Sequence, residues 1–228
     1  MNLYCIFPFI VLMLLACNNP KENENKHGKG TGVQKVTSMT SDSLQAGMIH
    51  PSLKCKHHPE NTFALYLPKK YKINSTYPLI LFLDAHARGT LPLEKYKWIA
   101  DGENLILAGS LKIENNQPWE QSKKTINTLI EELRNQYRVD VNQIYLSGFS
   151  GGARLAVLAA GERMDIKGVI GCAAGFANNH PRQSNFDFAG IVGMGDFNFL
   201  EMQKLDASLD NSGIDHYIFH FQGGHEWP

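Results

Sequence analysis

Two patterns of apolar residues alternate along residues 48–228. Short runs that are apolar almost throughout, such as 78–83 and 104–108, are typical of strands buried on both faces of a sheet. Longer segments with an apolar residue every three or four positions are typical of helices with one buried face, and residues 119–137 show this spacing most clearly. The alternation of the two patterns predicts a mostly parallel sheet with helices on both faces.

The predicted strands cover residues 62–67, 78–83, 104–108, 143–146, 168–172, 190–194 and 216–221. The predicted helices cover residues 94–100, 119–137, 153–160 and 200–209. In an α/β sheet of this kind, ligands bind in the loops beyond the carboxyl ends of the strands. Residues that follow a predicted strand are therefore the first candidates for a functional site.

The amino-terminal residues are predicted to be an export signal rather than part of the fold. Residues 3–16 are almost wholly apolar, but this run is shorter than the roughly 20 residues that a membrane-spanning helix needs. It ends in Leu14-Leu15-Ala16-Cys17, which resembles a bacterial lipobox. The resemblance implies that residues 1–16 are a lipoprotein signal peptide. A lipid on Cys17 would then anchor the exported protein in a membrane, at the periplasmic face or the cell surface. The alternative is an ordinary signal peptide with an incidental cysteine.

Composition divides the rest of the chain and argues against one class of partner. Residues 17–47 are polar and nearly free of aliphatic side chains, so we expect a flexible tether followed by a folded catalytic domain at 48–228. The zero formal net charge argues against a nucleic-acid-binding protein. The cysteines have no zinc-ligand or redox spacing. Cys55 and Cys172 are expected to be buried thiols, with a disulfide as the alternative.

Residues 148–152 read Gly-Phe-Ser-Gly-Gly and match the Gly-x-Ser-x-Gly nucleophile elbow. Predicted strand 143–146 leads into the motif and predicted helix 153–160 leads out of it, which is the layout that the elbow needs. Glycines flank the central serine because the turn is tight. We predict that Ser150 is a nucleophile; the alternative is a glycine-rich turn of structural value only.

The base that activates this serine is expected beyond the last predicted strand, because proteins with such an elbow carry serine, acid and histidine in that order. His225 lies there, after a Gly-Gly pair that lets the loop bend back over the serine. His216 and His220 fall within the last predicted strand, where packing or exposure to solvent is the simpler explanation. His180 precedes a proline in a loop and is a candidate to line the pocket.

The acid is expected after the strand before last. Asp196 follows predicted strand 190–194, so we predict that it holds the imidazole tautomer and stabilises the imidazolium. Asp187 precedes that strand, and Asp206 and Asp210 fall in the next predicted helix, where carboxylates are usually solvated. The alternative for Asp196 is a turn or helix-cap residue.

The tetrahedral intermediate of acyl transfer needs hydrogen-bond donors for its oxygen anion. The backbone N–H of Gly151, at the start of a predicted helix, is the first candidate. The second is expected in the loop after the third strand of such folds, near His86 or Ala87, and we take Ala87. His86, Trp119 and Trp227 are further candidates to line the substrate pocket, with core packing equally open for each tryptophan.

Five motifs in this order resemble α/β-hydrolase esterases related to polyhydroxybutyrate depolymerases and feruloyl esterases: LYLPKKY, LFLDAHARG, LAGS, YLSGFSGGAR and FQGGHEWP. The resemblance covers residues 63–228 and implies the α/β-hydrolase fold, with Ser150, Asp196 and His225 as a catalytic triad and the Gly151 N–H as oxyanion donor. It further implies hydrolysis of a small-molecule or polymer ester through an acyl-enzyme, without a metal or cofactor. Such esterases usually add a helix after the histidine loop, and the sequence shows none after His225.

We therefore expect an exported, lipid-anchored serine hydrolase. The residues leave alternatives open, because a serine peptidase or an acyltransferase uses the same fold and the same triad. A binding lipoprotein with impaired catalysis is a third possibility. The sequence does not indicate which ester is the substrate or how many copies of the chain assemble.

Overall fold

Strands and helices alternate along the chain in the computed structural model, which describes residues 44–177, 186–210 and 212–228. The strands are β1 (Ile49–Lys54), β2 (Thr62–Tyr66), β3 (Tyr77–Asp84), β4 (Ile106–Ser110), β5 (Val139–Phe149), β6 (Ile166–Cys172), β7 (Asp187–Gly193) and β8 (His216–Phe221). The helices are α2 (Thr90–Glu103), α3 (Trp119–Gln136), α4 (Gly151–Gly161) and α5 (Phe199–Leu209).

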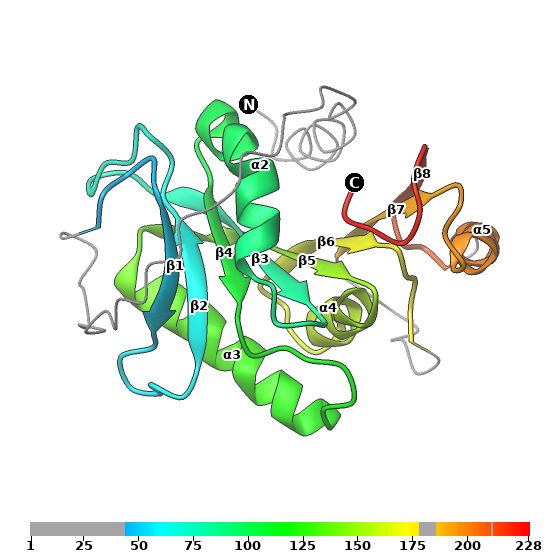
Figure 1. Ribbon diagram of the computed structural model, residues 1–228, viewed down its shortest axis with the longest axis horizontal. Helices are drawn as coiled ribbons and strands as arrows, with labels where there is room; N and C mark the ends of the chain where they lie inside the picture. The colour runs from blue at the N-terminus through cyan, green and yellow to red at the C-terminus, as the bar shows by residue number, and fades with distance from the viewer. Residues whose placement is uncertain (1–43, 178–185, 211) are drawn as a thin grey trace, which may run out of the picture.

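All of these strands join into one eight-stranded sheet with the order β1-β2-β4-β3-β5-β6-β7-β8. β2 pairs antiparallel with both β1 and β4, and every pair from β4 to β8 is parallel. The prediction of a mostly parallel sheet is confirmed. Because these strands run in the same direction, the loops after β3, β5, β7 and β8 reach the same edge of the sheet (Figure 1).

The sequence did not predict β1. This strand lies at the edge of the sheet, is largely exposed and contains Pro51, so it lacks both the apolar run and the alternation that identify strands. Four residues before it also pack on the domain, although the sequence assigns them to the tether. Leu44 is buried, and the Gly47 N–H donates to the carbonyl of Leu67 (2.9 Å).

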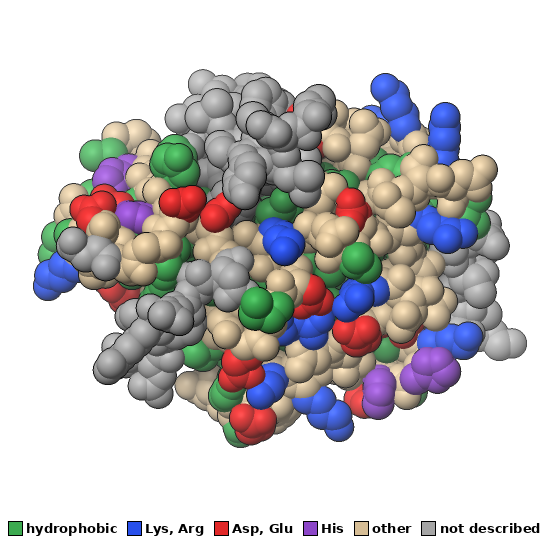
Figure 2. All heavy atoms as spheres, turned by 180° about the vertical axis from the view of Figure 1, so that it is seen from behind, with side chains coloured by type: hydrophobic (Ala, Val, Ile, Leu, Met, Phe, Trp, Pro, Cys, Tyr) green, Lys and Arg blue, Asp and Glu red, His purple; other side chains and the backbone are tan. Residues whose placement is uncertain are grey.

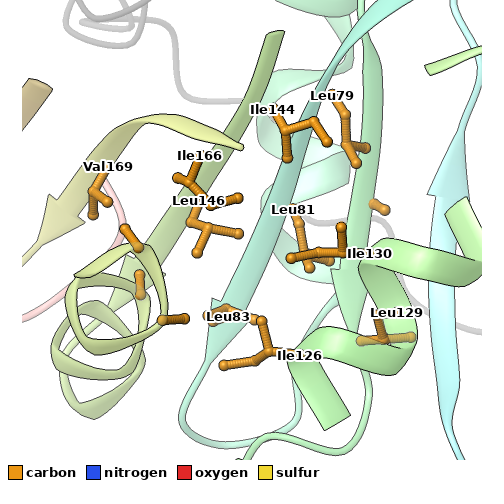
Figure 3. Packing of buried hydrophobic residues seen from close by; sticks show 14 of the residues in the cluster. Leu79, Leu81, Leu83, Ile126, Leu129, Ile130, Ile144, Leu146, Ile166 and Val169 are labelled. Atoms are coloured by element: carbon orange, nitrogen blue, oxygen red, sulfur yellow. The ribbon is translucent and has the colours of Figure 1, made fainter. Parts of the chain in front are cut away.

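Helices cover both faces of the sheet, as predicted (Figure 1). α2 packs on one face, against β2 and β4, while α3, α4 and α5 pack on the other. Figure 3 shows Ile126 and Ile130 of α3 beside Leu81 and Leu83 of β3. All of these side chains are fully buried, and each burial contributes about 1.5–3 kcal/mol relative to exposure.

After β8 the chain continues through a loop at residues 222–228, called here the histidine loop, without a further helix up to Pro228. Its end contacts α2, because Lys95 Nζ donates to the carbonyl oxygen of Trp227 (3.0 Å) and the Tyr96 hydroxyl donates to that of Pro228 (2.7 Å). The contacts hold the loop beside the face of the sheet that α2 covers.

Acidic and basic side chains are interspersed on the face of the molecule shown in Figure 2. In the described ranges, no helix combines the length and the apolar character that crossing a membrane requires. The predicted signal peptide, Cys17 and most of the predicted tether lie outside the described residues.

The two cysteines of the folded part are free thiols on opposite faces of the sheet. Cys55 belongs to the core beneath α3, and Cys172 belongs to the core beneath α2. Burial, followed by the charges of nearby glutamates, raises the pKa of Cys55 to about 12. Burial also raises the pKa of Cys172. The expected buried thiols are present, and the sheet between them separates their sulfur atoms.

Candidate active site

Ser150 lies at a sharp turn between β5 and α4. Its backbone torsion angles, φ 54° and ψ −121°, are ones that residues with a side chain rarely adopt, at a cost of about 1–3 kcal/mol. The Ser150 N–H donates to the carbonyl of Cys172 at the end of β6 (2.9 Å), which fixes the turn to the sheet. The serine thus sits in the strand–turn–helix layout that the motif predicts.

The turn requires glycine on both sides of the serine. A Cβ atom on Gly148 would overlap with the carbonyl oxygen of Gly152. A Cβ atom on Gly152 would in turn overlap with the carbonyl oxygen of Leu83. Both obstacles are main-chain atoms, so no side-chain rotation relieves the overlap. The motif therefore lets α4 and the end of β3 approach the turn closely.

The imidazole of His225 joins the serine to a buried carboxylate. His225 Nε2 lies 3.0 Å from Ser150 Oγ, and His225 Nδ1 lies 3.0 Å from each carboxylate oxygen of Asp196. Asp196 follows β7 and its side chain is fully buried, with a further hydrogen bond from the Asn198 N–H (2.8 Å). A proton on Nδ1, facing the carboxylate, leaves Nε2 to accept the serine proton.

Aromatic rings also contact this imidazole. The ring of Phe197 lies 4.1 Å from that of His225, centroid to centroid, and 76% of Phe197 is exposed. The buried ring of Phe149 lies 4.9 Å away. The imidazole is thus restrained by apolar contacts as well as by its hydrogen bonds, and an apolar side chain borders it at the surface.

A second buried carboxylate, that of Asp84 at the end of β3, connects two loops. Trp227 Nε1 donates to Asp84 Oδ2 (2.8 Å), and Arg88 donates from Nε to Oδ1 (3.2 Å) and from Nη2 to Oδ2 (3.1 Å). The His86 N–H donates to Oδ1 (2.9 Å). Burial raises the pKa of the Asp84 carboxyl, but these donors together hold that pKa below its usual value. Because Trp227 closely follows His225, Asp84 ties the histidine loop to the loop between β3 and α2.

The backbone donors predicted for the oxyanion differ in availability. Gly151 begins α4, so its N–H has no acceptor within the helix. The Ala87 N–H already donates to the carbonyl oxygens of Asp84 (3.0 Å) and Ile113 (2.9 Å), and the His86 N–H is taken by Asp84. The backbone N–H of Ala87 is therefore occupied by acceptors at Asp84 and in the loop between β4 and α3, and the predicted second donor is not available in this conformation.

Two of the residues predicted to line the substrate pocket contact Asp84 instead. His86 Nδ1 lies 3.2 Å from Asp84 Oδ1. Trp227 is only 4% exposed and stacks on Phe149, with ring centroids 5.5 Å apart. For Trp227, core packing is the alternative that the structure supports.

Trp119 lies away from the serine. Its indole N–H donates to Glu162, the residue that caps the carboxyl end of α4 (3.3 Å). Ser150 is at the other end of that helix, about 18 Å away at 1.5 Å per residue. The structure therefore does not bring Trp119 to the site.

The competing histidines have other partners. His216 Nε2 lies 3.4 Å from Asp206 Oδ1, and the ring of His220 packs on Phe199, with centroids 4.9 Å apart. His180 lies outside the described residues. In the part of the chain that the structure describes, no group of three or more His, Cys, Asp or Glu side chains could hold a metal ion.

Sequence reasoning missed two polar residues near the serine. Asp84 had a detectable signal, because a charged residue ends an otherwise apolar run in β3. Asn115 had none. Its side-chain oxygen would overlap with a Cβ atom on Gly151, so the amide lies directly against the residue that follows the nucleophile. This proximity depends on the path of the loop between β4 and α3.

The strand order, with the serine turn after β5 and the histidine after β8, defines the α/β-hydrolase fold. Comparisons of the sequence with protein-family models and with curated proteins find no match. Solved structures do match. An S-formylglutathione hydrolase from Staphylococcus aureus is similar with a TM-score of 0.65 at 12% identity, over 81% of this chain and 92% of that chain.

Two further solved structures are similar. A feruloyl esterase module from Clostridium thermocellum has a TM-score of 0.63 at 13% identity, over 80% of this chain and 83% of that chain. An esterase from Pyrobaculum calidifontis has a TM-score of 0.60 at 10% identity, over 79% and 78% respectively. At these identities the likeness is one of fold. The predicted α/β-hydrolase fold is confirmed, and its structural neighbours include esterases.

Proposed function

We propose that the protein is a serine hydrolase that cleaves carboxylic esters through an acyl-enzyme on Ser150. The observation that carries the proposal is the continuous hydrogen-bonded chain from Ser150 Oγ through His225 to Asp196, with 3.0 Å at each link. The esterases among the structural neighbours support the reaction class. Small-molecule esters are the expected substrates.

In the proposed reaction, Ser150 Oγ attacks the ester carbonyl carbon while His225 Nε2 takes the hydroxyl proton. The Gly151 N–H stabilises the oxygen anion of the tetrahedral intermediate, and Asp196 stabilises the imidazolium. The C–O bond to the alcohol then breaks, and the alcohol leaves with the proton from Nε2. Water next attacks the acyl carbon with His225 as base, which releases the carboxylic acid and restores the serine.

A peptidase or an acyltransferase is the second candidate, because the same groups accept an amide substrate or pass the acyl group to an alcohol. The discriminating measurement compares turnover of matched ester and amide substrates, with and without an alcohol acceptor. Turnover confined to esters with water as acceptor supports the esterase.

The test of the proposal is Ser150→Ala. It is expected to lower kcat for a p-nitrophenyl ester by about 10⁴- to 10⁶-fold, because the nucleophile is lost, and to abolish labelling by a fluorophosphonate probe. Ser147→Ala, in the strand that leads to Ser150, is the matched control and should retain both ester turnover and labelling by the probe. Undiminished turnover in Ser150→Ala with an unchanged melting temperature would contradict the proposal. Absence of labelling in the native protein would favour a binding protein.

We further propose that the domain is exported and anchored by a lipid on Cys17, at the periplasmic face or the cell surface. The support is the apolar run at residues 3–16 that ends in the lipobox-like Leu14-Leu15-Ala16-Cys17. A tether between the lipid and the domain would let the site reach substrates away from the bilayer.

A further inference from the structure

Among the residues that the structure describes, the predicted backbone donors supply only one free N–H for the oxygen anion. Acyl-transfer enzymes aim preorganised donors at this atom, and the Gly151 N–H supplies one. The N–H groups of His86 and Ala87 are both committed to acceptors within their own loop or its neighbour. The remaining candidates for a second donor to the oxygen anion are therefore the side chains that reach Gly151.

The loop between β4 and α3 brings such a side chain to the serine. Its backbone crosses the loop after β3 and is pinned there, because the Asn115 N–H donates to the carbonyl of Ala85 (2.9 Å). The flanking residues form an isolated bridge between His86 and Glu114. Asn115 is thus fixed through its own N–H and through the preceding residue, while no hydrogen bond to a described residue holds its side chain.

The Asn115 carboxamide lies in the space that a side chain at position 151 would fill. A Cβ atom on Gly151 would overlap with Asn115 Oδ1 and would lie 3.6 Å from Asn115 Cγ and 3.3 Å from the Cβ of Ala85. Among the described residues, the Asn115 side chain has no hydrogen-bond partner of its own. It is therefore a free amide beside the N–H that receives the anion.

We propose that the Asn115 side-chain amide is the second oxyanion donor of this enzyme; the inference rests on the proposed esterase function. A half-turn about the Cβ–Cγ bond exchanges Oδ1 and Nδ2 and directs the NH₂ group to the place that Oδ1 occupies. The anion is then held by the Gly151 N–H and by Asn115 Nδ2. The absence of a side chain at Gly151 keeps this space open for the amide.

The first test removes the amide. Asn115→Ala is expected to lower kcat for a p-nitrophenyl ester by about 10²- to 10³-fold with little change in KM, because the donor acts on the transition state. Binding of a trifluoromethyl ketone, which forms a hemiketal anion on Ser150, should weaken by a similar factor. Asn116→Gly is the matched control. It removes the neighbouring amide, and its left-handed backbone, φ 66°, suits glycine, so activity should stay within about twofold.

The second test displaces the amide without touching Asn115. Gly151→Ala keeps the backbone N–H but fills the space beside it, so it should lower kcat much as Asn115→Ala does. If both changes act through the same donor, kcat of the double variant should be at most about threefold lower than kcat of either single variant. Multiplicative losses in the double variant would overturn the inference.

These outcomes separate the inference from the function on which it rests. If the native protein hydrolyses the ester and Ser150→Ala does not, the esterase stands. Kinetics of Asn115→Ala within threefold of the native protein, or unchanged binding of the ketone, would then overturn the role of Asn115 alone. Ester turnover that persists in Ser150→Ala would remove both.

Discussion

At the scale of single residues, two of the described glycines illustrate opposite kinds of constraint. Gly152 faces the carbonyl oxygen of Leu83 so closely that no Cβ atom fits, while a Cβ atom on Gly102 in α2 would meet nothing within 4 Å. The first kind allows the serine turn to exist. The second is a flexible residue in a helix, where alanine is the better choice.

Opposite effects on stability are therefore expected. Gly152→Ala should lower the free energy of unfolding by about 3 kcal/mol, because the backbone must shift. Gly102→Ala should raise it by up to about 1 kcal/mol through helix propensity. Urea unfolding of both variants measures the difference. Equal stability of the two variants would show that the close approach at position 152 is not rigid.

The same scale shows what the sequence could predict of the site. Ser150, Asp196 and His225 each follow a strand, and a known motif and chain order select among the competitors. The structure joins these three side chains. Asp84 and Asn115 were missed because their roles arise where two loops cross, and no spacing along the chain encodes a crossing.

At the scale of elements, the histidine loop is held from the opposite half of the sheet as well as from β7. Trp227 inserts between Phe149 and α2 and reaches the buried carboxylate of Asp84. Lys95 and Tyr96 of α2 bind the last carbonyl oxygens. These contacts fix the loop that carries His225, the proposed base.

The contribution of Asp84 to stability should depend on pH. At neutral pH, Asp84→Asn is expected to cost about 3–5 kcal/mol, because it removes a buried carboxylate that accepts charge-assisted hydrogen bonds from Trp227, the His86 N–H and the half-exposed Arg88. The folded-state pKa of Asp84 is lowered, so its ionised form stabilises the fold above the unfolded pKa near 4. That stabilisation is lost as pH falls through the folded-state pKa.

Urea unfolding of the native protein and of Asp84→Asn between pH 7 and pH 3 measures this effect. The difference in free energy of unfolding between the two proteins should become smaller below about pH 4. Trp227→Phe, which keeps the aromatic stack and removes one donor, should cost less, about 1.5–3 kcal/mol. If the difference in free energy of unfolding between the native protein and Asp84→Asn does not change with pH, the ionised Asp84 carboxylate is excluded as the source of the stabilisation.

Elements were predicted from sequence wherever a buried run or a helical spacing identified them. The limits of these elements were less certain. Residue 104 was assigned to a strand, but Asn104 caps α2 in a left-handed conformation, φ 54°, and β4 starts only at Ile106. β5 begins at Val139, earlier than the predicted start at residue 143. The prediction missed these first residues because they lie in a polar, partly exposed stretch.

At the scale of the whole molecule, the folded domain and the proposed anchor are separate parts of the chain. The domain has two cores, one on each face of the sheet, and Ser150, Asp196 and His225, the proposed catalytic residues, meet at the carboxyl edge of the parallel strands. The proposed lipid site lies far ahead of it in sequence. In the proposed function, the folded domain performs the hydrolysis and the leader determines where the domain acts.

The anchor can be tested in a bacterial host supplied with an alkyne analogue of palmitate. The native chain should incorporate the label, and Cys17→Ala should lose it completely, because the thiol is the expected acylation point. Cys5→Ala, in the apolar run, is the control and should remain labelled. Labelling that survives in Cys17→Ala would contradict the lipoprotein proposal.

One acid residue that serves two loops has a consequence for how such a protein diverges over generations. Asp84 accepts from Arg88 on one side and from Trp227 on the other, so a replacement in either loop alters the anchor of its neighbour. The two loops are therefore expected to evolve together, because a substitution in one is tolerated only with a compensating substitution in the other. Phe197 lies outside this pair of loops and packs at the surface on the ring of His225, so a substitution there is expected to act on the proposed base directly and not through Asp84.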